Sequence, residues 1–71
     1  MTALKGRVRN HIRELRTARG LSQGVLAEMV GATRQTINAI EQEKYAPSLE
    51  LAFRLARAFG LAFEEVWTFE A

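Results

Sequence analysis

The fold of this chain is decided by residues 22–45, whose sequence is SQGVLAEMVGATRQTINAIEQEKY. Ser22 and Thr33 each precede a run with apolar residues at helical spacing, which predicts two short helices with these residues as N-caps. Gly31 stands between the helices and supplies the positive φ that a sharp turn needs. The stretch therefore predicts a pair of helices joined by a tight turn. In the first helix, we expect the inward stripe to be Val25, Leu26, Met29 and Val30.

The second helix of this pair has an exposed face that is polar and almost uncharged. At 100° per residue, Ile37 and Ile40 point to the core, and the outward positions are Gln35, Asn38, Ala39 and Gln42. An ordinary solvated helix face more often carries Lys and Glu pairs. We interpret this face as the working surface of the chain and the remainder as its support.

The N-terminal flank predicts one further helix. Asn10 is a good N-cap for a helix that ends near Arg19, and Gly20 is suited to follow its last turn. Before it, Val8 stands between two arginines in an alternation that suits a short edge strand.

The C-terminal flank predicts a longer helix followed by a mixed segment. Pro47 blocks helix continuation, and Ser48 caps a helix whose apolar residues repeat at helical spacing until Gly60. Residues 61–70 begin helically, but VWTF is β-branched and aromatic, which favours an extended end. We therefore predict a mainly all-α fold in a single domain spanning residues 1–71.

Composition limits the function classes. The 71 residues include no cysteine and one histidine, so a thiolate site is excluded and we expect no metal. No apolar run approaches the ~20 residues that cross a bilayer, and we expect a cytoplasmic protein with no membrane partner. Residues 1–20 carry six basic side chains and one acidic side chain, whereas residues 21–71 carry four basic and seven acidic ones. A basic end suits a polyanion, although a solvated arginine-rich helix face is the plainer interpretation.

The sequence gives little support to catalysis. A catalytic site needs a nucleophile, a base and a stabilising group close together. The single histidine, His11, lies in an arginine-rich segment, and Glu64 and Glu65 diverge by about 100° on a helix. Gly20, Gly24 and Gly31 do not have the spacing of a phosphate-binding loop. We therefore predict that the chain is not an enzyme and needs no cofactor.

A DNA-binding interpretation accounts for the polar helix face. In the major groove, glutamine and asparagine can contact adenine through two hydrogen bonds, and arginine can contact guanine in the same way. Arg34, Gln35 and Asn38 offer these groups within two helical turns. The residues placed to hold the phosphate backbone are Gln23, at a helix N-terminus, and Lys44 and Tyr45 beyond the second helix. Taken singly, each of these residues is as often an ordinary surface side chain.

Residues 10–67 resemble the helix-turn-helix domain of the Cro and phage-repressor family. The matching blocks are RELRTARGLSQ, LAEMVGATRQTINAIEQEKYAPSLE and LAFRLARAFG, in the family's order and at its spacing. Within the family, the chain is most similar to small bacterial regulators of the cytolysin-repressor kind. This resemblance implies a five-helix bundle with a helix-turn-helix core at residues 22–42. It also implies a short two-stranded antiparallel sheet formed by residues 8–9 and 67–69, and a homodimer.

The resemblance also implies roles for individual residues. The base-facing positions are Arg34, Gln35 and Asn38, with Thr36 and Ala39 beside them, and the phosphate side is formed by Gln23, Thr33, Lys44 and Tyr45. Arg16 and Glu41 match a family ion pair that bridges the first and third helices, which implies a structural role for both. The family commonly has a glycine where Glu43 stands. The helix that carries the base-facing positions is therefore expected to be capped differently at its C-terminus, and Glu43 brings a negative charge towards the phosphates. At position 24 the family more commonly has a residue that favours helix formation, where this chain has Gly24.

The sequence therefore predicts a transcriptional regulator that binds double-stranded DNA sequence-specifically. We expect a repressor that acts as a homodimer on an inverted repeat, with no small-molecule effector evident. Trp67 and Phe69 are the predicted dimer interface. The alternative is a protein-interaction module, or an antitoxin-like partner-binding protein, in which these aromatic residues and the fourth helix contact another chain and DNA binding is secondary.

Overall fold

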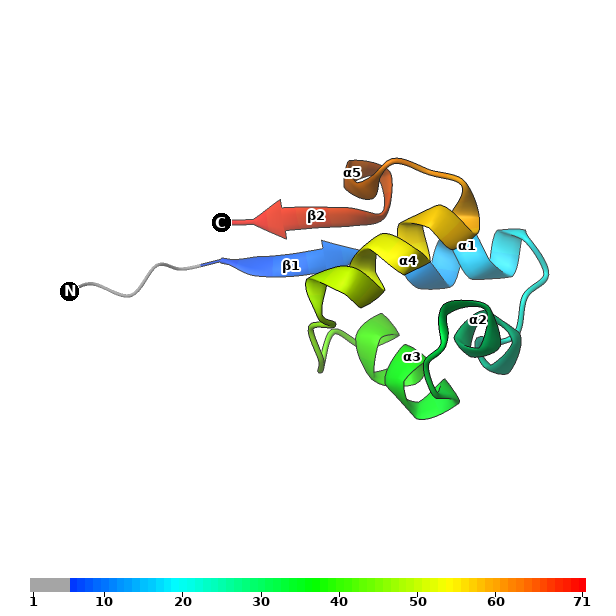
Figure 1. Cartoon of the computed structure of the whole chain (residues 1–71). Helices are drawn as coiled ribbons and strands as arrows, with labels where there is room; N and C mark the ends of the chain where they lie inside the picture. The colour runs from blue at the N-terminus through cyan, green and yellow to red at the C-terminus, as the bar shows by residue number, and fades with distance from the viewer. Residues whose placement is uncertain (1–5) are drawn as a thin grey trace.

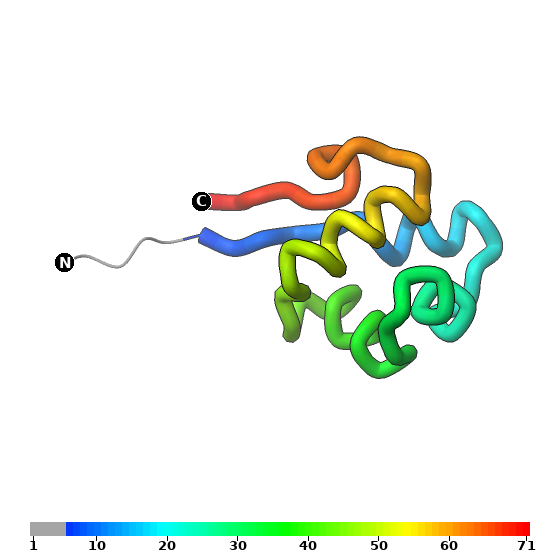
Figure 2. Tube along the Cα trace, in the orientation of Figure 1, coloured from blue at the N-terminus to red at the C-terminus, as the bar shows by residue number. Residues whose placement is uncertain are grey.

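The computed structural model describes residues 6–71. Its elements are, in order, β1 (Arg7–Asn10), α1 (Ile12–Ala18), α2 (Gln23–Val30), α3 (Arg34–Glu41), α4 (Leu49–Phe59), α5 (Phe63–Val66) and β2 (Trp67–Glu70). The helices form one body, with α3 and α2 together on one side of it and α5 on the other (Figure 1). Figure 2 shows both strands projecting side by side from one end of this body. The predicted mainly helical fold with a two-stranded sheet is confirmed.

Three helices begin where the sequence predicts, because each has a hydroxyl N-cap. Ser22, Thr33 and Ser48 accept a hydrogen bond from the backbone N–H three residues ahead, at distances of 3.0 to 3.1 Å. Each bond satisfies one of the N–H groups that a helix start leaves without an intrahelical partner. The turn between α2 and α3 is closed by Gly31, which has a φ of 72°. A left-handed φ is free of steric cost only for glycine.

The predicted start of α1 is wrong by two residues. Asn10 is the last residue of β1, where it pairs with Trp67, and α1 begins at Ile12. The Asn10 side chain still contacts the helix start, since its Oδ1 accepts from the Ile12 N–H at 3.1 Å. Its Nδ2 donates to the Ile40 carbonyl at 2.9 Å. A side chain that caps a helix from within a strand cannot be distinguished by sequence from an ordinary N-cap.

The predicted inward stripe of α2 is also partly wrong. Val25 and Met29 are 46% and 51% exposed. The residues that α2 buries are Leu26, Ala27 and Val30. Apolar side chains lie on more than one side of this helix, so the periodicity did not identify which of them face the core.

The core receives side chains from every helix. Its fully buried members are Ile12, Leu26, Ile37, Ile40, Leu55 and Val66. Trp67, the first residue of β2, also lies in this core with 5% exposure, and its Nε1 donates to the Ala52 carbonyl of α4 at 3.1 Å. Trp67 is therefore not the surface aromatic residue that the sequence predicted. Phe69 is 68% exposed.

The sheet is antiparallel, and its register pairs the two ends of the described chain. Arg7 lies opposite Glu70, Val8 opposite Phe69, Arg9 opposite Thr68 and Asn10 opposite Trp67. Gly6 is the residue that leaves room for the Phe69 ring, because a Cβ at this position would collide with it. No helix within residues 6–71 is long and apolar enough to span a membrane.

Candidate nucleic-acid interface

The candidate recognition surface is the outward face of α3. Arg34, Gln35 and Asn38 are exposed, whereas Ile37 and Ile40 on the opposite face are fully buried. The two isoleucines therefore fix how the helix is rotated about its axis, and this rotation turns the three polar residues outward. Thr36 and Ala39 lie beside them and are partly buried. The structure thus brings all five predicted base-facing residues to one helix.

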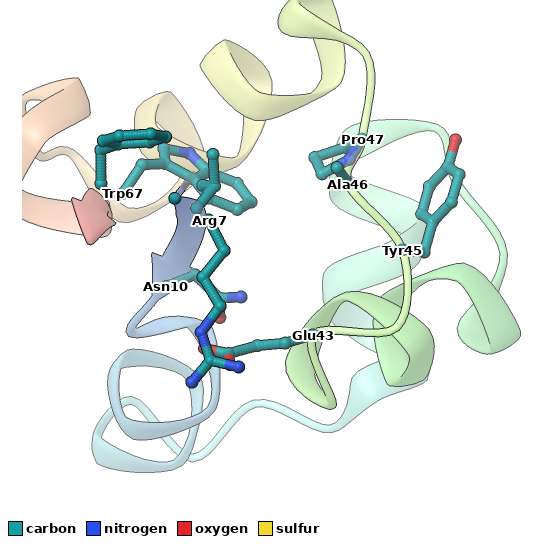
Figure 3. Close-up of a pocket in the computed structure, with 10 residues that line it drawn as sticks. Arg7, Asn10, Glu43, Tyr45, Ala46, Pro47 and Trp67 are labelled. Carbon is teal, nitrogen blue, oxygen red and sulfur yellow. The ribbon is translucent and has the colours of Figure 1, made fainter. Parts of the chain in front are cut away.

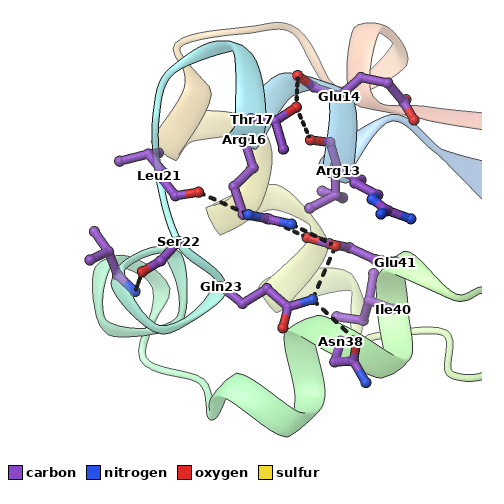
Figure 4. A network of polar contacts seen from close by, with 12 residues as sticks. Arg13, Glu14, Arg16, Thr17, Leu21, Ser22, Gln23, Asn38, Ile40 and Glu41 are labelled. Carbon is purple, nitrogen blue, oxygen red and sulfur yellow. Dashed lines mark hydrogen bonds and ion pairs between the residues drawn. The ribbon is translucent and has the colours of Figure 1, made fainter.

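The ion pair that the resemblance implies between Arg16 and Glu41 is present and joins α1 to α3 (Figure 4). Arg16 Nε lies 2.7 Å from Glu41 Oε2, and Nη2 lies 3.1 Å from Oε1, which is a two-point guanidinium–carboxylate contact. Arg16 Nη1 also donates to the Leu21 carbonyl at 2.9 Å. The side chains are only 12% and 4% exposed. The hydrogen bond from Arg16 to Glu41 raises the pKa of the guanidinium, so the pair remains charged.

Gln23 connects this ion pair to the recognition face. Its Nε2 donates to Glu41 Oε1 and to Asn38 Oδ1, both at 3.2 Å. An amide nitrogen has two hydrogens, so these contacts use both donors and leave only the acceptor Oε1. The sequence predicted a phosphate contact for Gln23, but in this arrangement its side chain has no N–H left to donate to a phosphate. Only its main-chain N–H, in the first turn of α2, is left for such a contact.

The exit from α3 is built around Glu43. Glu43 has a φ of 60°, and its N–H donates to the Ile40 carbonyl at 2.9 Å. The next N–H, of Lys44, donates to the Ala39 carbonyl at 3.0 Å. Glutamate thus occupies the left-handed position that glycine usually fills after a helix, and it satisfies the last carbonyl groups of α3 in the same way.

The Glu43 carboxylate is paired with a residue of β1. Its Oε2 lies 2.9 Å from Arg9 Nε, and Arg9 Nη1 in turn lies 3.1 Å from Glu70 Oε2. These contacts raise the pKa of Arg9, and the hydrogen bond that Arg9 donates to Glu43 has the largest effect. The negative charge expected to face phosphates is therefore neutralised by an arginine of the sheet.

Lys44 and Tyr45 follow Glu43 and are exposed. A hollow of about 350 Å³ lies between the loop beyond α3 and the sheet, and Figure 3 shows Pro47 on the side of this loop nearer Trp67, with the Tyr45 ring pointing away from Trp67. Lys44 and Tyr45 thus lie at the end of α3 away from Thr33, which caps its start. The predicted phosphate-contacting residues at 33, 44 and 45 bracket the base-facing residues.

Three of the five arginines at residues 6–20 lie in ion pairs within the fold. Arg7 and Arg9 approach Glu70, and Arg16 is paired with Glu41. Arg19, which has no ion-pair partner within residues 6–71, donates to the Leu15 and Phe59 carbonyls. Arg13 is exposed and likewise has no ion-pair partner in this part of the chain. It lines a hollow together with Gln23, Asn38 and Gln42. The sequence did not indicate Arg13 as a candidate interface residue, since nothing in the local pattern shows that this turn of α1 lies beside α3.

Comparison with known proteins identifies the family to which this fold belongs. A family model described as helix-turn-helix matches residues 12–66. The chain belongs to the helix-turn-helix family of the Cro and phage-repressor type. The matched residues contain all five helices, whereas β1 and β2 lie outside them.

The relatives are named as transcriptional regulators. The chain is 46% identical over 63 residues to the "uncharacterized HTH-type transcriptional regulator YgzD" of Bacillus subtilis, with 89% of this chain and 96% of that protein covered. It is 58% identical over 53 residues to an "uncharacterized HTH-type transcriptional regulator" of Methanothermobacter thermautotrophicus, covering 75% and 77% of the two chains. Among solved structures, the restriction-modification controller protein C.AhdI of Aeromonas hydrophila is similar with a TM-score of 0.72 and 39% identity. That match covers 76% of this chain and 82% of the controller.

As a helix-turn-helix protein, this chain is a DNA-binding regulator and not an enzyme. The two helices α2 and α3, with the Gly31 turn between them, lie within residues 22–42, where the sequence predicts the helix-turn-helix core. Across the described part of the chain, no group of three or more His, Cys, Asp or Glu residues is placed to hold a metal ion.

Proposed function

We propose that the chain is a sequence-specific transcriptional repressor that binds an inverted repeat of double-stranded DNA as a homodimer. The observation that carries this proposal is the exposed face of α3, where one guanidinium and two amides project from a helix fixed by Ile37 and Ile40. A helix with such a face fits the major groove, where these groups read base edges. Thr36 offers a hydroxyl beside them, and Ala39 offers a methyl group for a thymine methyl.

Contacts to the phosphate backbone are supported on both sides of α3. On one side lie Thr33 and the first turn of α2, whose main-chain N–H groups favour an anion. On the other side lie Lys44 and Tyr45. Arg13 adds a cation near Asn38 and Gln42. These groups would fix the position of α3 in the groove without reading sequence.

The proposed dimer interface consists of exposed apolar side chains of the sheet and of α4. Val8 and Phe69 are opposite neighbours in the sheet and are 47% and 68% exposed. Leu49 and Phe53 on α4 are 67% and 48% exposed, and the Phe53 ring lies 4.8 Å from the ring of Phe63 on α5. Exposed large apolar side chains on a small domain favour association. Trp67 lies two residues before Phe69 in β2, so its side chain is on the same face of the sheet.

A two-fold dimer would present two α3 helices to one side of DNA. Recognition helices in such dimers lie about 34 Å apart, one turn of DNA, so the operator would be an inverted repeat. A dimer seated on an operator that overlaps a promoter would block transcription.

Selection of duplexes from a random pool tests the proposal. We expect an enriched inverted repeat, with binding that weakens steeply as salt rises because phosphate contacts release counterions. Sedimentation of the free protein should give a dimer. Absence of binding to any duplex at low salt would refute DNA recognition. If the protein sediments as a monomer and selects no duplex from the pool, these results would instead favour the protein-interaction module. Its contact surface would then include Leu49, Phe53 and Phe69.

A further inference from the structure

The hydrogen bonds between the ion pair and the recognition face have only one possible direction. Arginine can only donate hydrogen bonds, and a carboxylate can only accept them. Glu41 therefore accepts from Arg16, and the amide group of Gln23 that faces the Glu41 carboxylate has to be its nitrogen. The same nitrogen lies 3.2 Å from Asn38, so the Asn38 atom facing it has to be the oxygen. The nearly buried ion pair thus sets the orientation of the Asn38 amide.

A second contact holds Asn38 in the same orientation. Gln42, one helical turn further along, donates from Nε2 to Asn38 Oδ1 at 3.2 Å. The oxygen therefore receives two N–H donors and has both of its lone pairs occupied. Figure 4 shows the Asn38 nitrogen pointing away from Gln23 and Glu41. This nitrogen has no hydrogen-bond partner among residues 6–71.

This orientation changes what Asn38 can read. Contact with adenine uses both ends of an amide, because adenine offers the N7 acceptor beside the N6 donor. Guanine offers two acceptors, N7 and O6, at the corresponding edge. We infer that Asn38 acts in the major groove as a donor only and selects guanine over adenine, with Gln23 and Gln42 as positioning residues. The inference rests on the proposed function, since it concerns the same α3 face.

Gln35 provides the internal contrast. It lies on the same exposed face, and its amide makes no hydrogen bond to the part of the chain described here. Its side chain can turn either end towards a base, so it can satisfy adenine with both groups. The two amide residues of α3 therefore have different specificities, although sequence alone gives both the same one.

The test begins with duplex selection for the wild-type protein, Asn38→Ala and Gln35→Ala. Each alanine variant should relax one base position, and these two positions should differ. The position relaxed by Asn38→Ala should be guanine. Replacement of this guanine by 7-deazaguanine should weaken wild-type binding by about twofold to tenfold and leave Asn38→Ala binding unchanged, as for the loss of one hydrogen bond.

Three outcomes would overturn the inference. In the first, Asn38→Ala relaxes no position. In the second, the position that it relaxes is an adenine, and the wild-type protein binds more weakly to a duplex in which 2-aminopurine replaces this adenine. The 2-aminopurine base lacks the 6-amino group, so weaker binding would show that Asn38 accepts a hydrogen bond from adenine. In either case duplex binding itself persists, so the proposed function stands. In the third, no duplex is selected by the wild type, and both proposals fall together.

A double variant tests the positioning residues directly. Gln23→Met with Gln42→Met removes both donors to Asn38 Oδ1 and should release the amide to rotate. We expect the preference for guanine over adenine at the Asn38 position to fall to within about twofold, a change that a purely structural role would not cause. Thermal melting of the double variant checks that the fold is kept. A well-folded double variant with the wild-type guanine preference would refute the positioning role.

Discussion

Replacement of Glu43 by glycine and by alanine should change stability by different amounts. Glu43 has a φ of 60°, in the left-handed region, where a residue with a Cβ costs roughly 1–2 kcal/mol. Glycine avoids this cost but loses about 0.5–1 kcal/mol more backbone entropy on folding than alanine does. Both variants lose the ion pair with Arg9, so its contribution cancels in the comparison. The glycine variant should therefore be more stable than the alanine variant by about 0.5–1 kcal/mol.

Urea denaturation followed by Trp67 fluorescence measures this difference, since the only tryptophan is buried. All variants are compared at one protein concentration because association shifts apparent stability. In thermal melting, the same difference corresponds to about 2–8 °C for a chain of this size. Glu43→Gln keeps the side chain but removes the charge, and it should be no more stable than the glycine variant. Equal stability of the glycine and alanine variants would refute the assignment of backbone strain to Glu43.

Further predictions concern the ion pair, the phosphate contacts and the sheet. Glu41→Gln leaves the nearly buried Arg16 without its charged partner and should lower the free energy of unfolding by about 3–5 kcal/mol; a loss below about 1 kcal/mol in urea denaturation would contradict the role of the pair. Lys44→Ala should weaken binding to all duplexes alike and reduce the salt slope by about one, measured by titration at several salt concentrations; altered base preference would contradict a phosphate contact. Phe69→Ser should shift sedimentation towards the monomer without unfolding the chain, because the ring is exposed, and an unchanged dimer would place the interface elsewhere.

The helix boundaries that sequence predicted correctly depend on local chemistry. Ser22, Thr33 and Ser48 cap helices through bonds to residues three positions away, so the signal and its partner lie in one short window. Gly31 is equally local. The start of α1 was predicted wrongly because Asn10 belongs to β1. There it pairs with Trp67 of β2, which is distant in the sequence.

The sequence predicted which residues lie on the exposed face of α3, but it did not predict the hydrogen bonds and ion pairs around this face. The outward positions of Arg34, Gln35 and Asn38 follow from helical geometry once Ile37 and Ile40 are buried. The bonds that Gln23 makes to Asn38 and Glu41 depend on how α2 crosses α3, and the partner of Glu43 lies 34 positions away in β1. Such contacts leave no periodic signal. The burial of Trp67 was missed for the same reason. The local sequence around an aromatic residue does not show whether its side chain packs into the core or remains exposed.

The sheet also bears on the order in which the chain folds. Arg9 and Glu70, which meet across β1 and β2, are 61 positions apart. Contacts between distant residues have to repay the entropy of closing a long loop, whereas helices form through contacts a few residues apart. The helical body should therefore form before the strands pair. A chain at that stage would carry a complete α3 but lack the sheet surface proposed to bind a second copy, so dimerisation would report that folding has finished.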